Sequence, residues 1–183
     1  MATGWIIGIT IAVLVLFLIF IYNSLVRLRN QVKNSWAQID VQLKRRNDLI
    51  PNLIKTVKGY MKHEKTVLEN LTKARTEFLS ASSVAGKAKA SNMMTDALKS
   101  IFAVAENYPD LKASQNFIQL QEELTGTENK IAYARQHYND MVMYLNTKCE
   151  SFPSNMVAGV FGFKQEEMFK VPESEKKNVS VEF

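Results

Sequence analysis

Cysteine, proline and glycine are all scarce in this chain of 183 residues, which contains one Cys, four Pro and seven Gly. Cys149 alone can form neither an intramolecular disulfide nor a cysteine-based metal cluster. A single Cys in a helical chain is typical of a small core residue, and neither His63 nor His137 lies in a motif that would activate it. Few helix breakers among many helix-forming residues predict an all-α protein.

Motifs for metal, nucleotide and nucleic-acid binding are also missing. His63-Glu64 begins like the zinc motif HExxH, but the fifth position is Val67, so one ligand is absent. Gly86-Lys87 resembles the end of a phosphate-binding loop, but the upstream glycine is absent. The net charge of +5 comes without a base-stacking motif. We therefore expect no cofactor, no bound metal, no enzymatic activity and no nucleic-acid partner.

The chain does contain one long apolar run, from Trp5 to Tyr22, without a single charged residue. As a helix it would be about 27 Å long, which is close to the hydrocarbon thickness of a bilayer. Aromatic rings at both ends suit the membrane–water interface. This pattern predicts a membrane anchor over residues 5–22, after a short tail of residues 1–4. The anchor residues expected to contact lipid are Trp5, Ile6, Leu14, Phe17, Phe20 and Tyr22.

A cleaved signal peptide is the alternative to a retained anchor. Residues 1–4 contain no Lys or Arg, and the run ends in Phe-Ile-Tyr-Asn rather than in a small-x-small cleavage site, which favours the anchor. Basic residues follow at Arg27, Arg29 and Lys33. The positive-inside rule then predicts an N-terminus outside and a domain in the cytoplasm, against the cell membrane.

Apolar residues at spacings of three and four predict an antiparallel bundle of about four helices over residues 23–150. The first helix is expected to continue the anchor as one rod to about residue 46. Asn47, Asp48 and Pro51 then predict a break, with Asp48 as the cap of a second helix that reaches about residue 80.

The later helices are predicted in the same way. Residues 80–92 are small and polar, which predicts a connector before a helix over about 90–106. The clearest stripe runs from Phe117 to Leu145 and predicts a helix that ends near Cys149, with packing like that of a coiled coil. Asp110 or Ser114 is its expected cap.

Two segments follow the predicted bundle. Residues 151–163 are apolar but too short to span a bilayer. They form either a cap over the open end of the bundle or a segment that touches lipid or a neighbouring subunit. Residues 164–183 are charged and lack periodicity, which predicts a flexible tail. The residues expected to make contacts in the apolar segment are Phe152, Met156, Val160, Phe161 and Phe163.

Several polar side chains stand next to the apolar stripes, on helices that we expect to face each other. One interpretation is an ion-pair network that sets the register of the helices. The other is a polar groove for a ligand or a partner. The residues of this candidate polar network are Asp40, Arg75, Glu128, Arg135 and Asn139.

Several short motifs follow one another along the chain, at residues 22–30, 36–46, 48–53, 58–60, 63–64, 127–135, 138–139 and 152–155. Their order resembles the LemA family over about residues 5–170. The resemblance implies a bacterial inner or cytoplasmic membrane anchor and an antiparallel helical bundle, and it implies little chemistry. The chain is too short for a kinase domain and lacks a nucleotide-binding glycine loop.

Two functions are compatible with these features. The first is a non-catalytic membrane scaffold that forms a homo-oligomer through the outer face of the first helix and residues 152–163, with membrane lipid around its anchor. The alternative is an adaptor that recruits a protein partner, such as a membrane protease or a stress-response component. An enzyme has no positive support, because His63, Glu64 and Cys149 form no triad in the sequence.

Overall fold

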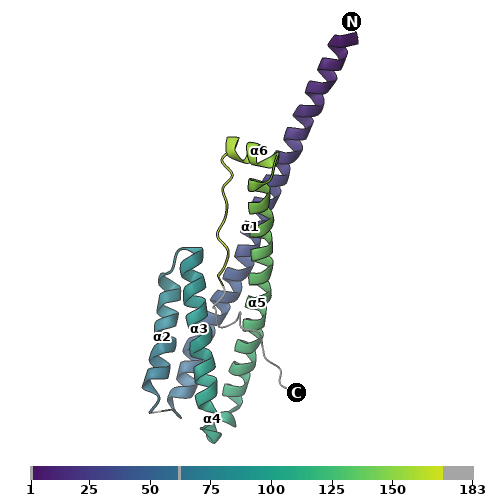
Figure 1. Cartoon of the computed structure of the whole chain (residues 1–183). Helices are drawn as coiled ribbons and strands as arrows, with labels where there is room; N and C mark the ends of the chain where they lie inside the picture. Colours follow the sequence, from purple (N-terminus) through teal and green to yellow (C-terminus); the bar gives the residue numbers. More distant parts are fainter. Residues whose placement is uncertain (1, 62, 171–183) are drawn as a thin grey trace, which may run out of the picture. The chain divides into compact units, whose positions relative to one another are not determined.

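The computed structural model describes residues 2–61 and 63–170, which contain six helices and no strand (Figure 1). This confirms the all-α prediction. The chain divides into a first unit of residues 1–37 and 136–168 and a second unit of residues 38–135 and 169–183. The helices are α1 (Ala2–Lys58), α2 (Lys65–Ser80), α3 (Val84–Ala105), α4 (Pro109–Lys112), α5 (Gln115–Glu150) and α6 (Ser154–Val160).

The N-terminal part of α1 exposes its apolar side chains all the way round. Every residue from 3 to 20 is exposed, whereas Ile21 and Leu25 are buried. By length and composition, α1 is the one helix among the described residues that is apolar enough to cross a membrane. A wholly apolar, wholly exposed helix is costly in water, and hydrocarbon removes that cost.

Helix α1 continues through Pro51 to Lys58, so the predicted break at residues 47–51 is wrong. Asp48 lies inside the helix and caps nothing. Pro51 lacks the amide that would bond to the carbonyl of Asn47, and its ring disfavours a helix interior. The buried stripe nevertheless stays in phase across the proline, and its burial outweighs that local cost. Its residues are each at most 1% exposed: Ile39, Leu43, Ile50, Leu53 and Val57.

The turn after Lys58 separates α1 from α2, so the helix that was predicted to reach about residue 80 begins only at Lys65. The third helix begins earlier than predicted. The hydroxyl of Ser83 accepts a hydrogen bond of 3.0 Å from the amide of Gly86, which caps the first turn of α3. Residues 84–90 therefore belong to α3. Small side chains of this segment, such as Ala88 and Ala90, are buried. Helix α3 packs beside α2 (Figure 1).

Helix α5 matches the clearest predicted helix, while the single turn of α4 was not predicted. Residues 164–170 are mostly exposed, but hydrogen bonds and one buried side chain fix parts of this segment, which was expected to be a flexible tail. The side chain of Asn146 donates to the carbonyl of Glu166 at 3.0 Å and accepts from its amide at 2.9 Å. Phe169 is 1% exposed. The rest of the predicted tail, residues 171–183, lies outside the described residues.

Candidate functional site

The predicted anchor residues all present their side chains outward from α1. Their exposed fractions range from 37% for Tyr22 to 77% for Trp5. The surface that would meet lipid is therefore continuous around the helix, as a bilayer requires. The other four predicted anchor residues have exposed fractions within this range: Ile6, Leu14, Phe17 and Phe20.

Helix α6 is held at the end of α5 by a serine. After the cis peptide bond between Phe152 and Pro153, the hydroxyl of Ser154 lies 2.7 Å from the carbonyl of Lys148 and 2.9 Å from that of Ser151. Val157 and Ala158 are buried, 5% and 2% exposed. One face of this short helix therefore packs within the first unit. Four large residues in α6 and directly beside it are exposed, and we call them the apolar collar: Phe152, Met156, Val160 and Phe161.

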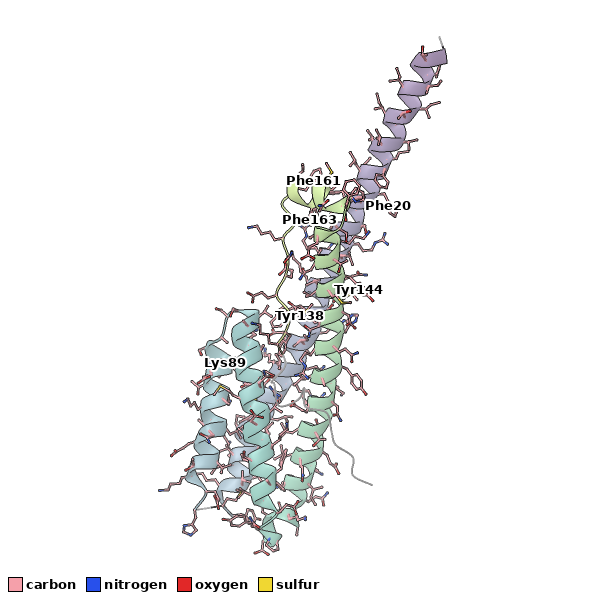
Figure 2. The ribbon with its side chains drawn as sticks, viewed as in Figure 1. Phe20, Lys89, Tyr138, Tyr144, Phe161 and Phe163 are labelled. Atoms are coloured by element: carbon pink, nitrogen blue, oxygen red, sulfur yellow. The ribbon has the colours of Figure 1, made fainter. Side chains whose placement is uncertain are left out.

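The apolar segment reaches the end of the membrane anchor. The ring of Tyr22 lies with its centroid 4.8 Å from that of Phe161 and 5.8 Å from that of Phe163. The guanidinium of Arg29 lies over the ring of Phe163, 5.0 Å from its centroid. Figure 2 shows Phe161 and Phe163 at the level of α1 that carries Phe20. The segment thus packs through Val157 and Ala158 and touches Tyr22 through Phe161, while Phe152, Met156 and Val160 stay largely exposed.

A buried arginine that the sequence analysis missed organises the polar residues of the second unit. Arg46 on α1 is fully buried, and its guanidinium donates to the carboxylate of Glu128 on α5 at 2.6 Å. It also donates to Thr95 at 3.0 Å and to the hydroxyl and carbonyl of Ser91 at 2.8 and 3.1 Å, both on α3. The Thr95 hydroxyl donates in turn to Glu128 at 2.7 Å. Three helices are therefore joined through one side chain.

Burial lowers the pKa of Arg46, and the charge of Arg135 lowers it further, while the neighbouring carboxylate of Glu128 raises it. An arginine keeps its proton in proteins, so the network contains a buried cation with one carboxylate beside it. A signal for this residue was present in the sequence. Arg46 occupies the position between Leu43 and Ile50 at which the buried stripe of α1 required a side chain.

The predicted polar residues divide between several places. Glu128 joins the network, and Arg135 is near enough for its charge to act on Arg46. Asp40 instead pairs with Lys87 on α3. The Nε atom of Arg75 is buried without a hydrogen-bond partner among the described residues. Asn139 belongs to the first unit, whereas the other four belong to the second.

The polar groove considered from the sequence has a small counterpart beside this network. A cavity of about 180 Å³ between α3 and α5 is lined in part by Thr95, Phe102, Leu124 and Glu128. Pockets for drug-sized ligands usually measure about 300–1,000 Å³. The cavity is therefore smaller than a typical ligand pocket, and the network beside it joins α1, α3 and α5.

The residues considered for catalysis are divided between the two units, since His63 and Glu64 belong to the second and Cys149 to the first. Among residues 2–61 and 63–170, no three or more His, Cys, Asp or Glu side chains come together in a way that could hold a metal ion. Burial and the adjacent charge of Glu150 raise the pKa of the Cys149 thiol. A raised pKa keeps the thiol protonated at neutral pH, which is the opposite of what a nucleophilic cysteine needs.

Comparisons with known proteins agree with the order of the sequence motifs. A model of the LemA family matches residues 35–183. Protein LemA of Metamycoplasma hominis is 25% identical over 158 residues, which cover 86% of this chain and 72% of that protein. Magnetosome protein MamQ 2 of Paramagnetospirillum magneticum is 24% identical, and MamQ of Magnetospirillum gryphiswaldense is 23% identical. Each of those two alignments covers 81% of this chain but only 64% of the magnetosome protein.

Proposed function

The chain belongs to the LemA family, and from this premise we propose that it is a non-catalytic, membrane-anchored scaffold that assembles from copies of itself. That it is a membrane-associated helical protein follows from the exposed apolar part of α1. Self-association and the absence of catalysis are the parts that we propose. Support for the second comes from Cys149, whose thiol is poorly suited to nucleophilic attack.

The observation that carries the proposal of self-association is a line of small residues in the membrane part of α1. Gly4, Gly8 and Ala12 are four residues apart and therefore lie on one side of the helix. Together with Trp5 and Ile9 they line a shallow groove. A Cβ atom built at either glycine meets nothing within 4 Å, so the space above both is open. In a bilayer, helices associate where small residues let their backbones approach closely.

The orientation of the anchor is also part of the proposal. Residues 23–37 carry Arg27, Arg29 and Lys33 and no acidic residue, which supports a cytoplasmic location for this end of the span by the positive-inside rule. In a Cys149→Ala background, Thr3→Cys should react with a membrane-impermeant maleimide on intact cells. A second variant, Tyr144→Cys, should react only after the cells are opened. The reverse pattern would contradict the orientation.

Self-association is tested by the mass of the full chain in nanodiscs or mild detergent. We expect a uniform assembly larger than a monomer. The double variant Gly4→Leu/Gly8→Leu should shift the distribution to monomers, because the added side chains hold the helices apart. Thr10→Leu is the matched control, since it adds an apolar side chain on the side of α1 opposite Gly8 and should leave the assembly intact.

A strict monomer for the unaltered chain would contradict the scaffold. The adaptor would then be the remaining candidate, and affinity capture from native membranes would be the next experiment. An assembly that survives in the double glycine variant would keep the scaffold but move the contact away from the line of small residues.

A further inference from the structure

Helix α6 has apolar residues on both of its sides. Val157 and Ala158 are buried, while Met156 and Val160 are 64% and 81% exposed. Phe152, just before the helix, is 80% exposed, and Phe161, just after it, is 60% exposed. An exposed cluster of large apolar side chains on a protein surface usually marks a contact with a partner or a membrane. The buried side of α6 explains how the helix packs within the first unit. It does not explain why the apolar residues of the collar are exposed.

The position of the collar along α1 indicates which surroundings these side chains contact. Phe161 contacts Tyr22, which is the last residue of the apolar run. Tyrosine and tryptophan rings concentrate at the membrane–water interface. A side chain within ring contact of Tyr22 therefore lies at the level where hydrocarbon gives way to headgroups. The collar continues the apolar surface of the anchor sideways, away from the axis of the span.

The charges around the collar favour anionic headgroups. Residues 23–37, beside Tyr22, contain no Asp or Glu, and Arg27, Arg29 and Lys33 are exposed there, as is Lys164. The acidic residues Glu150, Glu166 and Glu167 stand outside the apolar segment, on its two flanks. Arg29 lies over the ring of Phe163, which fixes a positive charge directly beside the collar. Each basic residue near an anionic surface adds to the attraction. The same charges would repel those of a second copy of the chain, so they favour lipid over self-contact at this surface.

We propose that the apolar collar of Phe152, Met156, Val160 and Phe161 inserts into the interface of an anionic bilayer beside the point where α1 leaves it. In this arrangement α6 lies in the plane of the membrane surface and forms a second membrane contact besides the span. Amphipathic helices with a basic flank bind interfaces in this way, with apolar side chains at the boundary between headgroups and acyl chains.

The test measures the depth of the collar in the full chain. In a Cys149→Ala background, Val160→Cys carries an environment-sensitive fluorophore in vesicles that contain 30% anionic lipid. Lipids brominated near the headgroup end of the acyl chain serve as the quencher. Tyr144→Cys is the matched control, because Tyr144 is exposed on α5 of the same unit and away from the collar (Figure 2). We expect quenching at position 160 to exceed that at position 144 by at least threefold.

Two outcomes would overturn the proposal. Equal and weak quenching at both positions would show that the collar stays in water. Weak quenching at position 160, combined with energy transfer between labelled chains that rises with the protein-to-lipid ratio, would assign the collar to a second copy instead. The variant Phe152→Asp/Met156→Asp gives an independent readout. Its charges lie on the uncovered side of α6, so the chain should still fold, and quenching at position 160 should fall to the level of the control.

This test is separate from that of the scaffold. The collar can insert in a monomer, and the chain can assemble through Gly4 and Gly8 without the collar. Loss of the assembly in the glycine variant with unchanged quenching at position 160 would therefore support both proposals.

Discussion

The guanidinium of Arg46 donates a hydrogen bond of 2.6 Å to the carboxylate of Glu128, which lies 82 residues further along the chain. The preceding arginine, Arg45, donates one of 2.7 Å to Glu123. The two pairs join the same two helices through the same chemical groups, but their surroundings differ. The Arg46 side chain is 0% exposed, whereas Arg45 and Glu123 are about half exposed, at 49% and 51%.

Removing the carboxylate that faces the buried Arg46 should be costly, although the Glu128 side chain itself is 35% exposed. Glu128→Ala leaves the cation of Arg46 buried without its counter-charge, which lowers the free energy of unfolding by about 3 kcal/mol. Glu123→Ala is the matched control and should cost less than about 1 kcal/mol, because water already solvates both of its charges. Chemical denaturation of the full chain in mild detergent, followed by circular dichroism, measures both. Equal costs for the two variants would contradict the role assigned to Arg46.

Replacing Pro51 should stabilise α1. Pro51→Ala restores an amide that can donate to the carbonyl of Asn47 and removes the clash of the ring, so we expect a gain of about 1–3 kcal/mol in unfolding free energy. Pro109→Ala serves as the control. Pro109 stands at the first position of α4, where a proline fits without loss, and its replacement should bring no gain. The same denaturation experiment decides between a stabilised chain and one in which Pro51 is needed.

The stability of the first unit should fall at high pH through Tyr138. Burial raises the pKa of its phenol to about 12, and the nearby charges of Glu166 and Glu167 act in the same direction. The hydroxyl donates to the carbonyl of Glu167 at 2.8 Å, which ties residues 164–168 to α5. Because the pKa in the folded chain is above the ordinary value of about 10, this contribution is complete below pH 10 and is lost as the pH rises through 12.

Tyr138→Phe tests this dependence. The variant removes both the titration and the hydrogen bond, so it should be less stable by about 1 kcal/mol at neutral pH and should lose less stability between pH 10 and 12. Tyr133→Phe is the control, because Tyr133 is 76% exposed on the same helix and should not alter the profile. Melting temperatures across this pH range report the difference, and identical profiles for the native chain and Tyr138→Phe would rule out the explanation.

The thiol of Cys149 should react slowly. Burial and the charge of Glu150 raise its pKa, so the thiolate population at pH 7.5 is smaller than in the unfolded chain. Alkylation by iodoacetamide should therefore be several-fold faster after denaturation, and the rate in the folded chain should rise with pH. A folded chain that reacts faster than the denatured one would mark Cys149 as an activated nucleophile and reopen the question of catalysis.

The positions of the helices were predictable where a single stripe of apolar residues ran along the whole helix. Residues from Phe117 to Leu145 alternate at three and four, and α5 follows them over its full length. Prediction failed where local and tertiary preferences disagreed. Pro51 and Asp48 favour a helix boundary locally, but the stripe from Ile39 to Val57 is buried as one surface, and its burial prevails.

The candidate sites show the same division. The anchor and the residues of the collar could be named in advance, because apolar runs and their length are properties of the sequence. The partner of Glu128 could not. Arg46 falls on the stripe position between Leu43 and Ile50, but the sequence does not show which carboxylate on a distant helix faces it. A buried arginine is stable in that position only because α3 and α5 supply hydrogen-bond acceptors and a counter-charge.

The sequence by itself determined that this protein is helical, that it carries one apolar span and that a second apolar segment follows the bundle. These features depend on composition and periodicity, which act over a few residues. The tertiary structure decided that α1 is unbroken at Pro51, that Arg46 joins three helices, and that Phe161 lies against Tyr22. Those relationships depend on contacts between residues far apart in the chain, where burial and charge pairing outweigh local preference.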